Sequence, residues 1–162
     1  MRFHLVDRIL EVEPGKKIRT VKNLTLAEEY LADHFPGFPV MPGVLMLQTL
    51  VESAAWLLRL TEDFKHSVIA LRDVKNVKYG TFMEPGKSLV TTVELAEELG
   101  SAADATFKGK GEMEGQSTVS ARFTLTRYNL GDRDPALAVI DERIVKELRQ
   151  HHLILSGAVK SV

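Results

Sequence analysis

Hydrophobic and polar residues alternate in two short segments at the start of the chain, a pattern typical of half-buried strands. Residues 3–12 alternate loosely and are rich in Leu, Val and Ile, and residues 17–24 alternate more clearly. Pro14 and Gly15 lie between them and favour a turn. The chain is therefore predicted to begin with two paired strands.

A stiff loop and a long apolar helix follow these strands. Residues 25–28 have the spacing of a capping box, which predicts a short helix over 26–32. Residues 34–43 hold three prolines and two glycines, so they form neither a helix nor a central strand. The next helix, over roughly 43–60, is apolar on nearly every side and is therefore expected to be buried all round.

Four further strands are predicted between residues 67 and 128. They cover 68–78, with a break near Asp73, then 88–97, 103–113 and 117–128. No helical pattern separates them, so the sheet is expected to be antiparallel. The alternation in the last two strands predicts these inward-facing positions: Ala103, Ala105, Phe107, Gly109, Gly111, Met113, Val119, Ala121, Phe123 and Leu125.

The end of the chain is predicted to be helical. Asp134 is placed as an N-cap and Pro135 as the first residue of a helix over 135–150. We interpret residues 1–130 as one α+β domain, an antiparallel sheet around one long helix, and 131–162 as a helical extension. Such a sheet leaves edges to cover, which favours self-association. The apolar stripe of the last helix consists of Leu137, Ile140, Ile144 and Leu148.

Composition narrows the class of protein. The length of 162 residues fits one domain, and a net charge of −1 gives no field that favours nucleic acid or an anionic membrane. The absence of cysteine excludes disulfides and thiolate chemistry. The start of the chain lacks the pattern of a signal peptide. The longest apolar stretch is interrupted by Gln48, Glu52 and Arg59, which argues against a membrane span. We expect a cytoplasmic protein.

The segment from His34 to Glu52 carries the candidate chemistry. A stiff loop holds His34 in place, and the helix that begins at Gly43 presents backbone N–H groups without intrahelical partners. These groups and the helix dipole favour a partly negative oxygen. Gly43 lacks a Cβ, so a ligand carbonyl can approach it closely. A base beside such a site suits proton removal next to a thioester carbonyl.

The sequence HFPGFPVMPGVL at residues 34–45 resembles the signature of the bacterial 3-hydroxyacyl-(acyl-carrier-protein) dehydratases of fatty-acid synthesis. Segments near residues 5–25, 77–89 and 107–116 resemble the same family in order and spacing. The resemblance implies a hot-dog fold, and a homodimer or a trimer of dimers with active sites at the subunit interface. It also implies a substrate carried on the phosphopantetheine arm of acyl carrier protein, with no metal or diffusible cofactor.

The resemblance also implies roles for individual residues. His34 would remove the proton from C2 of the 3-hydroxyacyl thioester, and the carbonyl of Val40 would orient its imidazole. The N–H of Gly43 would bind the thioester oxygen, and Val44 is placed with Val40 and Gly43 in the substrate-binding group.

One position departs from the family pattern. The family has a Glu or Asp fourteen residues after the histidine, and this chain has Gln48 there. An amide cannot donate a proton as a carboxylic acid does. Glu52, one helical turn later, is interpreted either as the displaced acid with a raised pKa or as a buried ion-pair partner. Arg59 and the pair His151–His152 are expected to be solvated.

Three functions remain open from the sequence. The favoured hypothesis is dehydration of 3-hydroxyacyl thioesters to trans-2-enoyl thioesters, with His34, Gln48 and Glu52 as the catalytic candidates. The first alternative is a hot-dog thioesterase in which Glu52 activates water. The second is a non-catalytic acyl-thioester-binding protein, since Gln48 replaces the usual acid.

Overall fold

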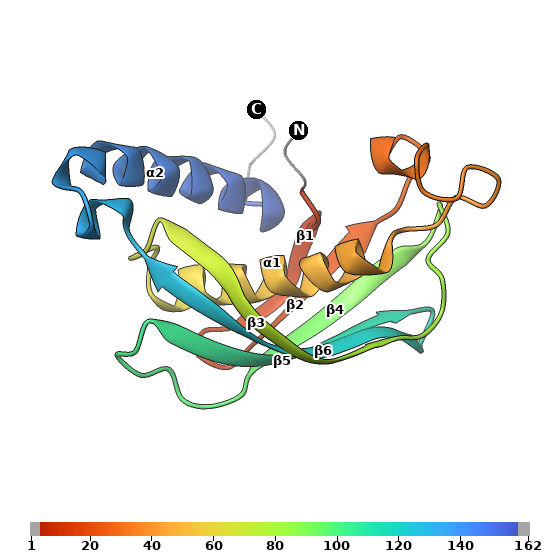
Figure 1. Ribbon diagram of the computed structural model, residues 1–162, viewed down its shortest axis with the longest axis horizontal. Coiled ribbons are helices and arrows are strands. Elements are labelled where there is room, and N and C mark those ends of the chain that lie inside the picture. The colour runs from red at the N-terminus through yellow and green to blue at the C-terminus, as the bar shows by residue number, and fades with distance from the viewer. Residues whose placement is uncertain (1–3, 159–162) are drawn as a thin grey trace.

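The computed structural model describes residues 4–158. In this range six strands form one antiparallel sheet in the order β1-β2-β4-β5-β6-β3. The strand bounds are β1 Arg8–Glu13, β2 Lys17–Asn23, β3 Val68–Tyr79, β4 Ser88–Leu95, β5 Asp104–Met113 and β6 Gln116–Tyr128. The sheet curves around the helix α1, Gly43–Thr61, as Figure 1 shows. The predicted α+β architecture is confirmed.

Buried hydroxyl groups join α1 to the sheet. Thr20 of β2 lies 2.8 Å from the Ser53 hydroxyl of α1 and 2.7 Å from the Thr91 hydroxyl of β4. Ser53 also donates to the carbonyl of Thr49 at 2.7 Å. These polar groups are fully buried, and each has a partner, so their desolvation is compensated. The network therefore fixes how α1 lies on the sheet.

The predicted strands agree closely with the observed ones. The break expected near Asp73 appears as an irregularity in the β3–β6 register between Leu71 and Asp73. The alternation in β5 and β6 is also observed: Phe107 of β5 is fully buried, and so are Phe123 and Leu125 of β6. The first predicted strand was too long, because β1 begins only at Arg8 and residues 5 and 6 are buried outside the sheet; residue 3 of the predicted range lies outside the described residues.

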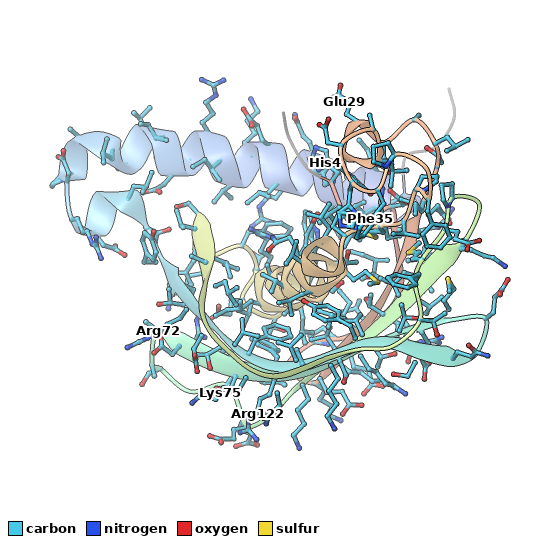
Figure 2. The ribbon with its side chains drawn as sticks, turned by 45° about the vertical axis from the view of Figure 1, so that its right-hand side comes forward. His4, Glu29, Phe35, Arg72, Lys75 and Arg122 are labelled. Carbon is cyan, nitrogen blue, oxygen red and sulfur yellow. The ribbon has the colours of Figure 1, made fainter. Side chains whose placement is uncertain are left out.

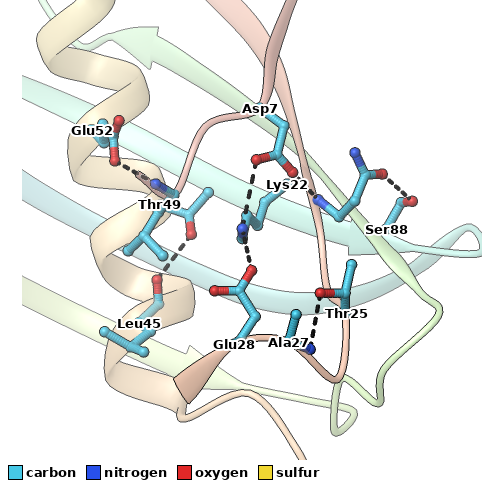
Figure 3. Close-up of polar contacts among 11 residues, drawn as sticks. Asp7, Lys22, Thr25, Ala27, Glu28, Leu45, Thr49, Glu52 and Ser88 are labelled. Carbon is cyan, nitrogen blue, oxygen red and sulfur yellow. Dashed lines mark hydrogen bonds and ion pairs between the residues drawn. The ribbon is translucent and has the colours of Figure 1, made fainter. Parts of the chain in front are cut away.

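The predicted helix over 26–32 was wrong except for one 3-10 turn, Glu29–Leu31. The Thr25 hydroxyl accepts from the N–H of Ala27 at 3.2 Å. The capping box does not close, because the carboxylate of Glu28 pairs with Lys22 at 2.6 Å (Figure 3). Lys22 also lies 3.5 Å from Asp7. The Glu28 carboxylate that a capping box would need is therefore paired with the buried Lys22 instead.

Helix α1 is not buried on all sides, contrary to the prediction. Val44 is 66% exposed and Gln48 is also exposed, whereas the second half of the helix is covered. Helix α1 is long and apolar enough to span a membrane by length and composition alone, but in this fold it is the core helix of the sheet.

The chain ends in the helix α2, Ala138–Leu155, which follows two 3-10 turns, Leu130–Asp132 and Pro135–Leu137. Asp134 accepts from the N–H of Ala136, as an N-cap does, but it caps the 3-10 turn. Helix α2 lies over α1 on the side away from the sheet (Figures 1 and 2).

Asp141 of α2 is the main polar anchor between this helix and the rest of the chain. It accepts from the Ser67 hydroxyl, from the N–H of Gly131 at 2.8 Å and from the N–H of Leu130 at 3.0 Å. The apolar stripe was predicted only in part, since Ile140 is exposed and Asp141 takes the inward position beside it. The domain boundary near residue 130 stays a prediction.

Candidate active site

His34 lies three residues after the 3-10 turn, at the start of the loop that leads to α1. Its backbone N–H donates to the carbonyl of Tyr30 at 3.2 Å, and its ring meets the ring of Phe35 edge-on with centroids 4.5 Å apart. Phe35 has a positive φ of 51°, which is uncommon for a bulky residue. Strained backbone of this kind concentrates at functional sites. The structure therefore holds the imidazole in a defined, partly buried position.

The stiff loop is anchored at its far end. Val40 and Met41 are buried, and the N–H of Met41 donates to the carbonyl of Met83 at 2.8 Å. The Nδ1 atom of His34 is buried and has no hydrogen-bond partner among residues 4–158. The Val40 carbonyl therefore does not accept from Nδ1 here, and its orienting role stays a prediction.

Gly43 opens α1 with its backbone close to an aromatic ring. A Cβ at this position would lie 3.1 Å from the ring of Tyr79. The sequence assigned this free space to a ligand, and the structure shows that Tyr79 of β3 occupies it. The carbonyl of Pro42 accepts from the N–H groups of Leu45 and Met46, which leaves those of Gly43 and Val44 as the free donors of the first turn. The N–H groups of Gly43 and Val44 can still donate to a ligand oxygen. The missing Cβ of Gly43 also allows the Tyr79 ring to pack closely against the backbone.

Gln48 and Glu52 line one cavity of about 610 Å³ between α1, α2 and β3. Glu52 is partly buried, and its carboxylate accepts from the N–H of Leu5 at 2.9 Å (Figure 3). Burial raises the pKa of Glu52, although the Leu5 N–H and the charges of His4 and Arg59 oppose the shift. A carboxyl that holds its proton to a higher pH is suited to act as an acid.

The structure does not bring all predicted site residues together within one chain. His34, Val40, Gly43 and Val44 are not among the described residues that line the cavity of Gln48 and Glu52. Nine residues of α1 separate Gly43 from Glu52, which is about 14 Å along the helix axis. The loop of His34 and the carboxyl of Glu52 therefore belong to different regions of the described chain.

Sequence reasoning missed part of the cavity wall. Arg59, expected to be solvated, lies with its guanidinium 5.1 Å from the Trp56 ring centroid and lines the cavity. His151 stacks on both Trp56 and His4, with centroids 5.7 Å and 4.6 Å apart, so it is not solvated either. His152 also packs near Trp56. The seven-residue spacing from Glu52 to Arg59 was a usable signal, because it returns to the same helix face.

Residues 4–158 hold no group of three or more His, Cys, Asp or Glu side chains placed to bind a metal ion.

Comparison with known proteins identifies the family. The sequence profile of the FabA-like domain matches residues 1–122, which is more than half of the chain. The chain belongs to the FabA-like domain family. The matched range includes the loop of His34 and the whole of α1, but it ends before α2.

Several curated relatives of this FabA-like protein are named 3-hydroxyacyl-(acyl-carrier-protein) dehydratase FabZ. The FabZ of Janthinobacterium sp. (strain Marseille) is 36% identical over 135 residues, which cover 82% of this chain and 85% of that protein. The FabZ of Geobacillus thermodenitrificans is 35% identical over 134 residues, covering 81% and 87%. The FabZ of Wolbachia pipientis wMel is 40% identical over 93 residues, and that match spans only 65% of its length.

Solved structures confirm the hot-dog fold of the FabA-like chain. The dehydratase heterocomplex ApeI:P from Xenorhabdus doucetiae has a TM-score of 0.65 at 13% identity, covering 83% of this chain and 89% of that one. The protein smu.793 from Streptococcus mutans, bound to acetyl CoA, has a TM-score of 0.58 at 12% identity, covering 78% and 92%. At such low identity these likenesses support the fold alone.

Proposed function

We propose that this protein dehydrates 3-hydroxyacyl thioesters carried by acyl carrier protein to trans-2-enoyl thioesters, as a step of fatty-acid synthesis. The observation that carries the proposal is the family match, which includes the His34 loop and the start of α1. The names of the curated relatives specify the substrate class. The family and its soluble reaction partners also favour the cytoplasm as the location, which stays a prediction.

The proposed reaction assigns one task to each group. An imidazole nitrogen of His34 removes the proton from C2, and the thioester oxygen takes up charge at the N–H groups of Gly43 and Val44. Glu52 then donates a proton to the 3-hydroxyl group. The C3–O bond breaks, water leaves, and the electron pair from the C2–H bond forms the double bond between C2 and C3. Gln48 lies beside Glu52 in the cavity and holds the departing hydroxyl by a hydrogen bond.

We expect the purified protein to convert a 3-hydroxyacyl-(acyl-carrier-protein) to its enoyl product at a typical enzymatic rate, about 1–10³ s⁻¹. Mass spectrometry of the acyl chain on its carrier measures the loss of water directly. Release of free carboxylate would instead identify a thioesterase. Tight binding of the substrate without any product would identify a protein that only binds acyl thioesters, and both results would contradict the proposal.

We further propose that the working enzyme is at least a homodimer, with the His34 half-site of one subunit meeting the Glu52 half-site of its partner. Within the described residues β3 pairs with β6 on one side, and its other edge is open. Leu71 and Tyr79 on this strand are 41% and 48% exposed. An open twelve-residue edge with exposed apolar side chains favours pairing with a second copy.

Light scattering coupled to gel filtration tests this assembly. We expect twice the mass of one chain, or six times for a trimer of dimers. Leu71→Asp, which places a charge in the proposed interface, is expected to reduce the mass to that of a monomer and to abolish dehydration. Lys75→Asp on the same strand changes an exposed side chain and serves as the control. A wild-type monomer that is fully active would contradict the proposal.

A further inference from the structure

Helix α2 gives this protein a cavity wall that lies outside the matched family range. The cavity of about 610 Å³ is closed on one side by Val51 and Ala55 of α1 and on the other by Ile144, Leu148 and Ile154 of α2. The family match ends at residue 122, so the second wall is a feature of this chain beyond that match. A volume of this size suits a small molecule, and the walls suit an apolar one.

One charged group faces this cavity without a contacting counter-ion in residues 4–158. The Nε of Arg59 is buried without a hydrogen-bond partner, and no ion pair or hydrogen bond joins this guanidinium to any residue in 4–158. The guanidinium lies over the face of the Trp56 ring. Burial lowers the pKa of Arg59 to about 10, against the opposing charge of Glu52, so the group is a cation at neutral pH.

The carboxylates near Arg59 have other partners. Glu52 accepts the Leu5 N–H at 2.9 Å, and Glu147 lies 3.2 Å from the Nε of Arg143. His151 also lines the cavity, and burial lowers its pKa, with His4 and Arg59 adding to the shift, so it carries no positive charge at neutral pH. Arg59 is partly buried, and a partly desolvated guanidinium without a contacting anion in residues 4–158 is costly to the fold. An anionic ligand would remove that cost.

We propose that this cavity binds a medium-length alkyl chain ending in a carboxylate, and that Arg59 holds the carboxylate. A guanidinium presents paired N–H donors that match the two oxygens of such a group. Gln48 and Arg59 are eleven residues apart on α1, about 16 Å along the axis, which leaves room for the chain between the two helices.

The ligand has two possible sources with the same chemistry. It is either a free fatty acid or the distal end of a substrate whose acyl chain carries a second carboxylate. The second alternative, a substrate with a distal carboxylate, rests on the proposed dehydratase function. It also requires that the acyl chain extends from the thioester past Glu52 towards Arg59. Binding of a free fatty acid requires no turnover, so the two proposals can fail separately.

Trp56 allows the binding to be measured directly. It is the only tryptophan of the chain, it lines the cavity and it contacts Arg59. We expect dodecanoic acid, added below its micellar concentration, to change the tryptophan fluorescence saturably, and 1-dodecanol to bind about 10- to 100-fold more weakly. Arg59→Met should weaken dodecanoate binding by the same factor and leave dodecanol unaffected.

Arg122→Met is the matched control, because Arg122 projects from the outer face of the sheet, away from α1 (Figure 2). It should bind dodecanoate as the wild type does. Equal binding of dodecanoate and dodecanol by the wild type, or unchanged dodecanoate binding by Arg59→Met, would overturn the proposal. Thermal denaturation adds a second test: Arg59→Met should melt at the same or a higher temperature, whereas a large fall with unchanged binding would give Arg59 a purely structural role.

Kinetics distinguish the two sources. If the carboxylate belongs to the substrate, a 3-hydroxyacyl thioester with a distal carboxylate should lose about 10- to 100-fold in kcat/KM in Arg59→Met, while the same substrate without that carboxylate loses little. If the ligand is a free fatty acid, both substrates respond equally, and dodecanoate binds with the Arg59 dependence described above. Failure of all dehydration, with Arg59-dependent fluorescence intact, would refute the proposed function alone.

Discussion

The His34→Ala variant is expected to lose about 10²–10⁴-fold in kcat for dehydration, the usual contribution of a positioned general base. Two other histidines, His4 and His151, line the Glu52 cavity, where they stack on each other, and His66 lies near Glu62 at the end of α1. None of these lies in the loop of His34. The proton on C2 of a thioester is weakly acidic, so its removal depends on a base in the correct place.

The variant should keep its fold. The His34 side chain is only partly buried, and its Nδ1 has no hydrogen bond to lose within the described structure. The backbone N–H of residue 34 can still donate to the carbonyl of Tyr30. Circular dichroism and the oligomeric mass should therefore match the wild type. Asp33→Asn, at the exposed neighbouring position, controls for disturbance of the loop and should remain active. Turnover in His34→Ala within a few-fold of the wild type would exclude His34 as the base.

The sequence predicted the sheet well because its signals are local. Alternation of side chains fixes which face of a strand is buried, and the irregularity of β3 was visible at Asp73. The long helix α1 was found within one residue at its C-terminal end, because Pro42 and Gly43 mark its start and its apolar run defines its extent. These features require no knowledge of distant contacts.

The parts that failed depend on contacts between segments far apart in the sequence. The capping box at Thr25 did not form, since Lys22 takes the Glu28 carboxylate. The burial of Arg59 and His151 depends on how α2 docks on α1. Two residues of α2 fix this docking: Arg149 binds Asp63, and Asp141 accepts from Ser67 and from the backbone of residues 130–131. Gly43 was assigned to ligand approach, and only the fold shows Tyr79 beside it.

For the candidate site, the structure bears on which residues lie together, while their catalytic roles stay predictions. Gln48 and Glu52 share one cavity, as their four-residue spacing indicated. Gly43 and Glu52 lie about 14 Å apart along α1 by the helical rise, and the site we propose is completed by a second subunit. The uncovered sheet edges predicted self-association, but the pattern within one chain does not say which residues of two subunits meet.

Glu52→Gln is expected to lower kcat by about 10²–10⁴-fold if Glu52 is the acid that protonates the leaving hydroxyl. The double variant Gln48→Glu/Glu52→Gln restores the order of the two residue types that the resemblance implies for the family, and most of the lost rate should return. Glu29→Gln, an exposed change of the same kind, is the matched control and should be fully active (Figure 2). Rates are measured with the same carrier-bound substrate throughout.

The pH dependence of the rate gives an independent test of the same residue. Burial raises the pKa of Glu52, so the carboxyl keeps its proton at pH values where an ordinary glutamic acid has lost it. The acid form should therefore persist into a higher pH range, and kcat should fall as the pH rises through this raised pKa. In the double variant Gln48→Glu/Glu52→Gln, the pH at which kcat falls should change, because the acid then lies at the exposed position 48.

The thermal stability of the protein should also depend on pH through Glu52. Because the folded-state pKa of Glu52 is raised, its contribution to stability is fully present below the ordinary carboxyl pKa and is lost as the pH rises through the folded value. Glu52→Gln should therefore gain thermal stability relative to the wild type as the pH is raised from the ordinary carboxyl range towards neutral, and Gln can still accept the Leu5 N–H. If Glu52→Gln keeps full turnover while Gln48→Ala loses it, Glu52 is only a structural acceptor for Leu5. The leaving hydroxyl would then depart with the help of the amide at position 48 alone.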